Sequence, residues 1–216
     1  DLHVTRRRQR QMCIRDSNPK TLTLTLTNSG YSQVYDGDAA ADITPSWSFN
    51  GFISGDTIAT IAYTGRNYNT ANVTTANLIT VSGLSITSVA GGNSSAPEDY
   101  VLDSTTKTVN ATITPKTVSL AVAPKVYDAS TDMTGYVSIT TGVGGETLTY
   151  NGATSNDAHV ATADKYLDAI TLGNASDGSG GLASNYQLPT LNVANAPISI
   201  TPKTVSLAVA PKVYDA

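Results

Sequence analysis

Closely spaced aspartates are the residues of this sequence whose types and spacing most directly suggest ligand chemistry. Asp36, Asp38 and Asp42 form one group, and Asp128 and Asp132 form a second. Carboxylate oxygens are the ligands that Ca²⁺ prefers, but aspartate side chains also cap turns by accepting hydrogen bonds from nearby backbone amides. We predict turn capping without a bound cofactor, and calcium binding is the alternative.

Catalytic chemistry has little support in the residue pattern. His159 has no second His or Cys at metal-ligand spacing, so zinc binding is not predicted. Ser, His and Asp all occur, but the sequence holds no Gly-x-Ser-x-Gly turn of the kind that presents a nucleophilic serine. We therefore predict that the chain is not an enzyme and has no catalytic residues.

Aromatic residues are the remaining candidates for ligand contact. Trp47, Tyr63 and Tyr68 could stack on sugar rings if they are exposed. Tyr100 and Tyr186 open similar blocks in two parts of the sequence, and we consider two roles for them. Each either stacks on a glycan or lies in a core with its hydroxyl bound to a loop, as in a tyrosine corner, and we favour the core.

The composition predicts that all of these residues are carried by β-strands. Hydrophobic residues make up 40% of the 216 positions and charged residues only 14%, and there are 11 Tyr against two Phe and one Trp. Val118, Leu120 and Val122 alternate with small or polar residues, which is the period of a strand with one buried face. No stretch shows a helical period of apolar residues, so the fold class is all-β.

Residues 1–17 differ from the rest of the chain. They contain five of the thirteen basic residues and the only cysteine, Cys13. Their amino-acid sequence resembles translated adapter sequence, so we interpret them as a non-native N-terminal segment or a disordered tail. Since the basic cluster is confined to this tail, the remainder has no nucleic-acid-binding pattern. No apolar run is long enough to be a transmembrane segment.

Internal duplication organises the remainder. Residues 113–129 are identical to residues 200–216, and Pro-Lys-Thr occurs at 19–21, 115–117 and 202–204. Val-Tyr-Asp follows each of these, at 34–36, 126–128 and 213–215. We divide the chain into a first copy (18–114), a second copy (115–201) and the truncated first strand of a third copy (202–216). Each full copy is expected to close its own core.

The strand pattern of the second copy predicts a fold. Short strands separated by Gly-Gly at 144–145, Asn-Gly at 151–152 and a polar loop at 174–181 favour a small Ig-like β-sandwich, repeated in tandem. A β-grasp-like small sheet domain is the alternative, although it requires a helix. The expected strands are 117–123, 135–140, 146–151, 158–163, 166–172, 185–191 and 195–201.

An ordered series of blocks carries a resemblance to a known family. Pro-Lys-Thr, Lys-Val-Tyr-Asp, Gly-Gly-Glu-Thr-Leu-Thr-Tyr, and Leu-Ala-Ser-Asn-Tyr-Gln-Leu leading to Ile-Thr-Pro-Lys resemble the YDG-type repeats of filamentous haemagglutinin-like bacterial adhesins. The resemblance covers nearly all of 18–216. It implies a tandem array on a large secreted or cell-surface protein, outside the bacterial cell, with neighbouring repeats as partners and no enzymatic activity.

The motif that names the family varies among the copies. It is intact at Tyr35-Asp36-Gly37, whereas the later copies read Tyr127-Asp128-Ala129 and Tyr214-Asp215-Ala216. Alanine resists positive φ, so a turn that demands glycine is not assured in the later copies.

Two functions remain as alternatives. In the first, the copies are a stalk or spacer that projects a distal binding region. In the second, exposed aromatic residues such as Trp47, Tyr63 and Tyr68 make each copy an adhesive module for host glycans or matrix. We favour the spacer because the blocks shared by the copies consist of core and turn residues, whereas Trp47 has no counterpart in the second copy.

Overall fold

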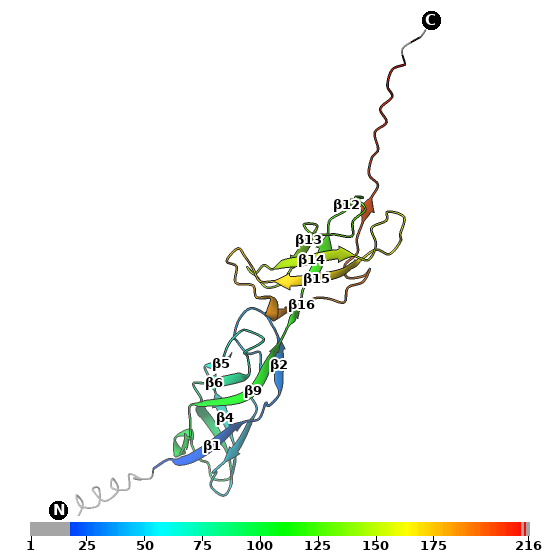
Figure 1. The fold of residues 1–216 in the computed structure, drawn as a ribbon. Helices are drawn as coiled ribbons and strands as arrows, with labels where there is room; N and C mark the ends of the chain where they lie inside the picture. The colour runs from blue at the N-terminus through cyan, green and yellow to red at the C-terminus, as the bar shows by residue number, and fades with distance from the viewer. Residues whose placement is uncertain (1–17, 213, 215–216) are drawn as a thin grey trace, which may run out of the picture. The chain divides into compact units, whose positions relative to one another are not determined.

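The structure is a computed structural model that describes residues 18–212 and 214 (Figure 1). The tail at 1–17 lies outside the described residues, as do Asp215 and Ala216. The regular elements of the described part are β-strands together with two three-residue 3-10 helices, which confirms the all-β prediction. This part contains no α-helix, which the β-grasp alternative would require, and no helix long and apolar enough to cross a membrane.

The chain divides into two compact units. Of the described residues, the first unit comprises 18–32, 39–70 and 76–112, and the second comprises 33–38, 71–75, 113–212 and 214. The sequence places residues 33–38 and 71–75 in the first copy, yet both segments lie in the second unit. The compact units therefore do not coincide with the copies.

Two extended sheets and a hairpin organise the strands of the first copy. The sheets have the strand orders β3-β1-β8 and β2-β9-β6-β5, and β4 pairs with β7. The division between the two units falls within β2 and within β9. The elements are β1 (Lys20–Leu26), β2 (Tyr31–Val34), β3 (Trp47–Asn50), β4 (Asp56–Ala62), β5 (Gly65–Tyr68), β6 (Leu78–Ser82), β7 (Ser85–Gly91), η1 (Pro97–Asp99), β8 (Tyr100–Leu102) and β9 (Thr106–Thr114).

Shorter strands, paired two by two, form the second copy. The pairs are β10 with β16, β11 with β13, β12 with β17, and β14 with β15. The elements are β10 (Lys116–Thr117), β11 (Ser119–Val122), β12 (Lys125–Val126), β13 (Val137–Thr140), β14 (Thr149–Ser155), β15 (Leu167–Gly173), η2 (Ala183–Asn185), β16 (Tyr186–Gln187) and β17 (Ile200–Thr201).

Strand pairing repeats in the same register in the two copies. Lys20 pairs with Tyr100 in a parallel ladder, and Lys116 pairs with Tyr186 in the same way. Antiparallel ladders place Leu26 opposite Trp47 and Val122 opposite Val137. The sheet β3-β1-β8 is therefore mixed, whereas an Ig-type sandwich is built from antiparallel sheets. The Ig-like topology remains a prediction.

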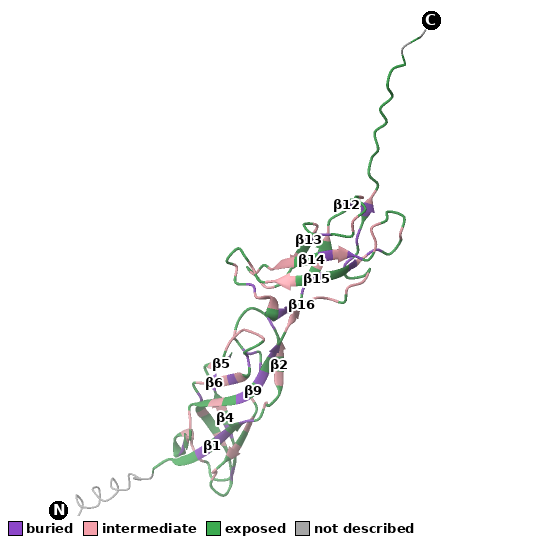
Figure 2. Ribbon diagram, viewed as in Figure 1, coloured by how far each residue is buried: buried purple, intermediate pink, exposed green. Residues whose placement is uncertain are grey.

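Alternation along β1 explains why it lies at the centre of its sheet. Leu22, Leu24 and Leu26 are buried, and the threonines between them are exposed (Figure 2). Around Leu22, the first unit gathers Ala59 and Tyr100, with Phe49 and Phe52 packed against them. Burying each large apolar side chain contributes roughly 1.5–3 kcal/mol, so this face is the main stabilising element of the strand.

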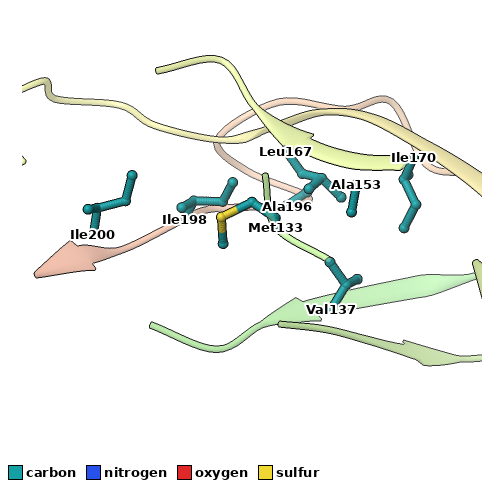
Figure 3. Close-up of a cluster of buried hydrophobic side chains, with 8 residues drawn as sticks. All are labelled: Met133, Val137, Ala153, Leu167, Ile170, Ala196, Ile198 and Ile200. Atoms are coloured by element: carbon teal, nitrogen blue, oxygen red, sulfur yellow. The ribbon is translucent and has the colours of Figure 1, made fainter. Parts of the chain in front are cut away.

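Apolar side chains from four separate stretches of sequence form the core of the second unit. Figure 3 shows this cluster, and Leu120, Val122 and Tyr127 are among the partly buried residues packed against it. The cluster comprises Met133, Val137, Ala153, Leu167, Ile170, Ala196, Ile198 and Ile200.

Two local predictions for the second copy are wrong. Residues 158–163 form a turn-rich loop instead of a strand, because the Lys165 ammonium donates to the carbonyl oxygens of Val160 and Thr162 and holds the chain in a compact bend. Asn151-Gly152 lies inside β14 instead of between strands. The ladder shifts register after Asn151, and Gly152 has φ +64°, which is the backbone of a β-bulge.

Residues 202–212 contain no regular element (Figure 1). The side chains of Val205, Leu207 and Val209 are exposed, with Leu207 at 93%. In the second copy, the corresponding positions are the partly or fully buried Val118, Leu120 and Val122. The same residues thus lack a sheet partner in one place and have one in the other.

Candidate functional site

The Tyr-Asp-Gly segment of the first copy lies in a polar cluster of the second unit, which we call the tyrosine cluster (Tyr35, Glu146 and Tyr186). The Tyr35 hydroxyl donates to Glu146 Oε1 at 2.6 Å, and the Tyr186 hydroxyl donates to Glu146 Oε2 at 2.8 Å. The two rings meet edge to face, with centroids 5.4 Å apart. Both tyrosines are buried, with Tyr35 only 4% exposed. One carboxylate thus satisfies two buried phenols.

Backbone hydrogen bonds fix each member of the tyrosine cluster. Tyr35 follows β2, and its N–H donates to the Thr114 carbonyl at 2.9 Å. Glu146 ends a turn in which its N–H donates to the Val143 carbonyl at 3.3 Å. Tyr186 begins β16, directly after η2. Three segments that are distant in sequence therefore present their side chains to one another from rigid positions.

Burial and the neighbouring carboxylate change the acidity of both phenols. Burial, reinforced by the hydrogen bond to Glu146, raises the pKa of Tyr35 from 10.0 to about 12. The same two causes raise the pKa of Tyr186 above its usual value. Both hydroxyls are therefore protonated donors at neutral pH. The arrangement can hold segments together, but neither phenol is activated as a nucleophile or base.

The residues after Tyr35 form a tight turn that needs its glycine. Asp36 accepts a hydrogen bond from the Asp38 N–H at 3.3 Å and another from the Gln33 side-chain amide at 2.8 Å. Gly37 has φ +99°, and a Cβ atom at this position would lie 2.6 Å from Val143 Cγ1. Glycine is thus required both for the backbone conformation and for close approach to the loop that carries Glu146.

The second copy keeps the turn although alanine replaces the glycine. Ala129 has φ +64°, and Asp128 accepts a hydrogen bond from the Ser130 N–H at 3.0 Å. The buried Lys125, 3% exposed, donates to the Ser130 and Asp132 carbonyls and pairs with Asp128 at 2.9 Å. These contacts hold the loop closely enough to keep Ala129 in the left-handed region, at a cost of about 1–2 kcal/mol.

The aspartates that sequence spacing suggested for calcium are engaged in turns. Asp36 and Asp128 accept the bonds described above, and Asp132 accepts from the Thr134 N–H at 2.8 Å. In the second copy, the Lys125 ammonium lies beside these oxygens and supplies the positive charge that a cation would bring. The described residues contain no group of three acidic, His or Cys side chains arranged to hold a metal ion.

A second contact holds the loop at 71–75 within the second unit. The Asn185 side chain, 1% exposed, accepts from the Val73 N–H at 3.0 Å and donates to Asn72 Oδ1 at 3.1 Å. Asn185 immediately precedes Tyr186, so the same short segment contacts both pieces of the first copy that belong to this unit. A buried side-chain amide with both ends bonded specifies its partner strongly.

The first unit contains a related arrangement around Tyr100 and Asp56. The Tyr100 hydroxyl donates to Asp56 Oδ2 at 2.7 Å and accepts from the Ile53 N–H at 3.2 Å. The Asn93 amide donates to Asp56 Oδ1 at 3.1 Å. Hydrogen bonds from the Ser95 and Tyr100 hydroxyls lower the pKa of Asp56, while burial raises the pKa of Tyr100. Tyr100 and Tyr186 are both buried, so neither presents a ring face to a glycan.

The three aromatic residues considered for ligand contact are placed differently. Tyr68 is 4% exposed and its hydroxyl donates to the Thr112 carbonyl at 3.0 Å, so its ring is packed inside the first unit. Tyr63, after β4, is 37% exposed, and Trp47 on β3 is half-buried. Within the part of the chain that the structure describes, no ring contact joins any two of the three.

Sequence reasoning missed Glu146 and Asp56, which are central to the two arrangements. The block Ile53-Ser-Gly-Asp-Thr57 matches Val143-Gly-Gly-Glu-Thr147, with an acidic residue between glycine and threonine in each. Both blocks form the same turn, since Asp56 N–H donates to the Ile53 carbonyl at 3.2 Å. An acidic residue retained at this place in both copies was the available signal.

Comparison with known proteins finds a similarity for the first copy. Residues 18–108 match the model of the YDG domain, and the matched stretch includes the Tyr35-Asp36-Gly37 motif. A search of curated proteins and a search of solved structures found no significant match. The first copy is therefore similar to YDG domains, within a chain whose described part is an all-β structure.

Proposed function

We propose that this chain is a spacer segment of a large secreted bacterial surface adhesin, in which the copies project a distal binding region. The observation that carries the proposal is the use of the motif tyrosines. Tyr35, Tyr100 and Tyr186 are buried, and each hydroxyl donates to a carboxylate. Three of the tyrosines that recur between the copies are thus occupied in holding the protein together.

The composition of the second unit supports the same proposal. Residues 33–38 and 71–75 of the first copy belong to this unit, so the preceding copy contributes contacts to it. In a tandem array, contacts between neighbouring repeats contribute a large part of the stability. A segment built in this way suits a mechanical or positioning role, and each added copy extends it by one unit.

No catalytic role is part of the proposal. The tyrosine cluster consists of one carboxylate that accepts two hydrogen bonds from phenols whose raised pKa keeps them protonated. Catalysis by proton transfer requires a group that changes its protonation state near the working pH. We place the chain outside the cell, on the bacterial surface or secreted, with neighbouring copies as its partners.

The alternative is that each copy is itself an adhesive module for glycans or matrix. The exposure of Tyr63 and the half-buried Trp47 favour it, because aromatic faces near the surface can stack on sugars. The register places Trp47 where the second copy has Val137. A ligand site built on this tryptophan would therefore belong to the first copy only.

Binding of the purified chain to glycan arrays and host-matrix proteins tests the proposal. The spacer role predicts no saturable binding by the parent chain or by Trp47→Ala and Tyr63→Ala. Tyr214→Ala is a matched control, because Tyr214 is 88% exposed and reports on unspecific adhesion of an aromatic side chain. Saturable binding that Trp47→Ala abolishes and Tyr214→Ala preserves would establish the adhesive module instead.

A second experiment tests the spacer role directly. Increasing numbers of copies are placed between a cell-surface anchor and a binding domain of known ligand. The spacer role predicts that reach to an immobilised ligand increases with copy number while the affinity of the binding domain stays constant. Attachment to a surface that lacks the ligand of that domain, increasing with copy number, would contradict the spacer role.

A further inference from the structure

The turn before β4 and the start of β8 reproduce, in the first unit, the residues that hold Tyr35 in the second unit. Asp56 corresponds to Glu146 and Tyr100 to Tyr186, as the equal turns and equal strand registers show. Ile53 corresponds to Val143 and Asp99 to Asn185. Both arrangements contain a buried tyrosine that donates to a carboxylate, at 2.7 Å in the first unit and 2.8 Å in the second.

In the second unit, this arrangement is covered by a Tyr-Asp-Gly segment. The Tyr35 hydroxyl reaches the second oxygen of Glu146, the Tyr35 ring packs on the edge of Tyr186, and Gly37 lies against Val143. These contacts define what the arrangement accepts, namely a phenol that donates to the carboxylate, followed after one residue by a small residue in a positive-φ turn.

In the first unit, a cavity of about 370 Å³ lies beside this arrangement and is lined by Asn93 and Tyr100, which both donate to Asp56; we call it the Asp56 pocket. Ile53, the counterpart of the covered Val143, is 47% exposed at its edge. The residues that line the cavity are Lys20, Ile53, Asn93, Ser94, Ser95, Asp99 and Tyr100. An exposed isoleucine beside a buried carboxylate is the surface expected when the apolar partner of that residue is missing.

We propose that the Asp56 pocket accepts the Tyr-Asp segment of another copy of this repeat. The incoming phenol would donate to the Asp56 carboxylate in place of the Asn93 amide or the Ser95 hydroxyl, because Tyr100, Asn93 and Ser95 already donate to this carboxylate and fill its roughly four acceptor sites. Its ring packs on Tyr100, and the small residue two places later covers Ile53. This deepens the proposed function and rests on it, because a spacer array needs a rule by which successive copies join.

The second copy carries a donor that fits this rule. The Tyr127 N–H donates to the Thr201 carbonyl at 2.9 Å, as the Tyr35 N–H donates to the Thr114 carbonyl at 2.9 Å. The Tyr127 ring stacks on His159 at 6.4 Å, and its hydroxyl forms no hydrogen bond in the described part of the chain. The sequence of the donor is Tyr127-Asp128-Ala129, with the small residue at the place of Gly37. Tyr127 is thus held like Tyr35 but has no carboxylate to bind.

A peptide titration followed by ¹⁵N NMR tests the proposal. The probe is a peptide of residues 123–130, added to the full chain carrying Tyr214→Ala so that its exposed tyrosine does not compete. We expect amide shifts at Ile53, Asn93 and Tyr100, and their loss when the peptide carries Tyr127→Ala. They are also lost in an Ile53→Asp chain and kept in an Ile58→Asp chain, a control because Ile58 is 55% exposed and does not line the pocket.

A lengthened chain provides a second measurement in which the donor is covalently presented. Residues 19–114 are appended after Thr201, which reproduces the Thr-Pro-Lys junction of residues 114–116, so that Tyr127 precedes an Asp56 pocket. Tyr127→Phe should then speed amide exchange in the appended copy by roughly tenfold or more, while the same substitution leaves the original chain unchanged. The amide shifts in the titration or the faster exchange in the lengthened chain, if dependent on both Tyr127 and Ile53, support the pocket as an acceptor. Absence of both responses overturns it, whatever the glycan arrays show about the spacer role.

Discussion

Replacing Tyr35 with phenylalanine removes one hydroxyl and leaves the rest of the tyrosine cluster in place. The ring can still pack edge to face on Tyr186, and the Tyr35 N–H can still donate to Thr114. The substitution therefore isolates the hydrogen bond from the phenol to the Glu146 carboxylate at 2.6 Å. Its expected effect falls on the second unit, although residue 35 belongs to the first copy.

The magnitude follows from the charge of the acceptor and from its exposure. A hydrogen bond to a charged group contributes about 1.5–3 kcal/mol to stability. Glu146 is half-buried, so water can partly replace the lost donor, and Tyr186 continues to donate to the other oxygen. We therefore expect Tyr35→Phe to reduce the free energy of unfolding of the second unit by about 1.5 kcal/mol, the lower end of that range.

Native-state amide hydrogen exchange can assign the loss to one unit. The Leu167 N–H, bonded to the Ala196 carbonyl, reports on the second unit, and the Leu84 N–H, bonded to the Thr105 carbonyl, reports on the first. Exchange at Leu167 should become roughly tenfold faster in Tyr35→Phe, with Leu84 unchanged. Tyr127→Phe is the matched control and should change neither. Equal acceleration at both amides, or an equal effect of Tyr127→Phe, would refute the assignment of Tyr35 to the second unit.

Three further predictions concern pH and the loop residues. Because folding raises the pKa of Tyr35 from 10.0 to about 12, the stability it provides is complete below pH 10 and is lost as pH rises through 12, so alkaline denaturation should be shallower in Tyr35→Phe. In urea titrations, Ala129→Gly should raise the free energy of unfolding by about 1 kcal/mol, whereas Gly37→Ala should lower it by about 2 kcal/mol or more. Two substitutions that change this free energy in the same direction would contradict the turn assignment. Lys125→Met should cost about 2–3 kcal/mol in the same assay, because two carbonyls lose their donor, whereas the exposed Lys203→Met should stay within about 0.5 kcal/mol.

The local sequence pattern predicted the parts of the fold in which buried and exposed residues alternate along a strand. Leu22, Leu24 and Leu26 are buried in β1 as a two-residue period requires, and the equivalent alternation in the second copy gives β11 and its buried neighbour Val118. The aligned positions of Lys20 and Lys116 also predict equal pairing, because the same apolar pattern fixes the same register. All-β architecture therefore follows from the sequence.

Contacts between residues that are distant in sequence could not be predicted from the local pattern. Residues 33–38 lie in the second unit because Tyr35 finds a carboxylate there, a contact between positions 111 residues apart. Glu146 gave no local signal of burial, since an acidic residue in a glycine-rich turn usually faces solvent. The expected strand at 158–163 failed because a single lysine, Lys165, bends that segment through two carbonyl contacts. In each case a polar side chain overrode the local pattern.

A double-mutant cycle between Tyr35 and Glu146 tests most directly whether the Tyr-Asp-Gly segment is an integral part of the second unit. The free energy of unfolding is measured through exchange at Leu167 for the parent, Tyr35→Phe, Glu146→Ala and the double variant. Direct contact predicts a coupling energy of about 1–2 kcal/mol, with the double variant less destabilised than the sum of the single variants. Additive effects, with a coupling energy below about 0.3 kcal/mol, would contradict the contact and with it the joining of the copies through this motif.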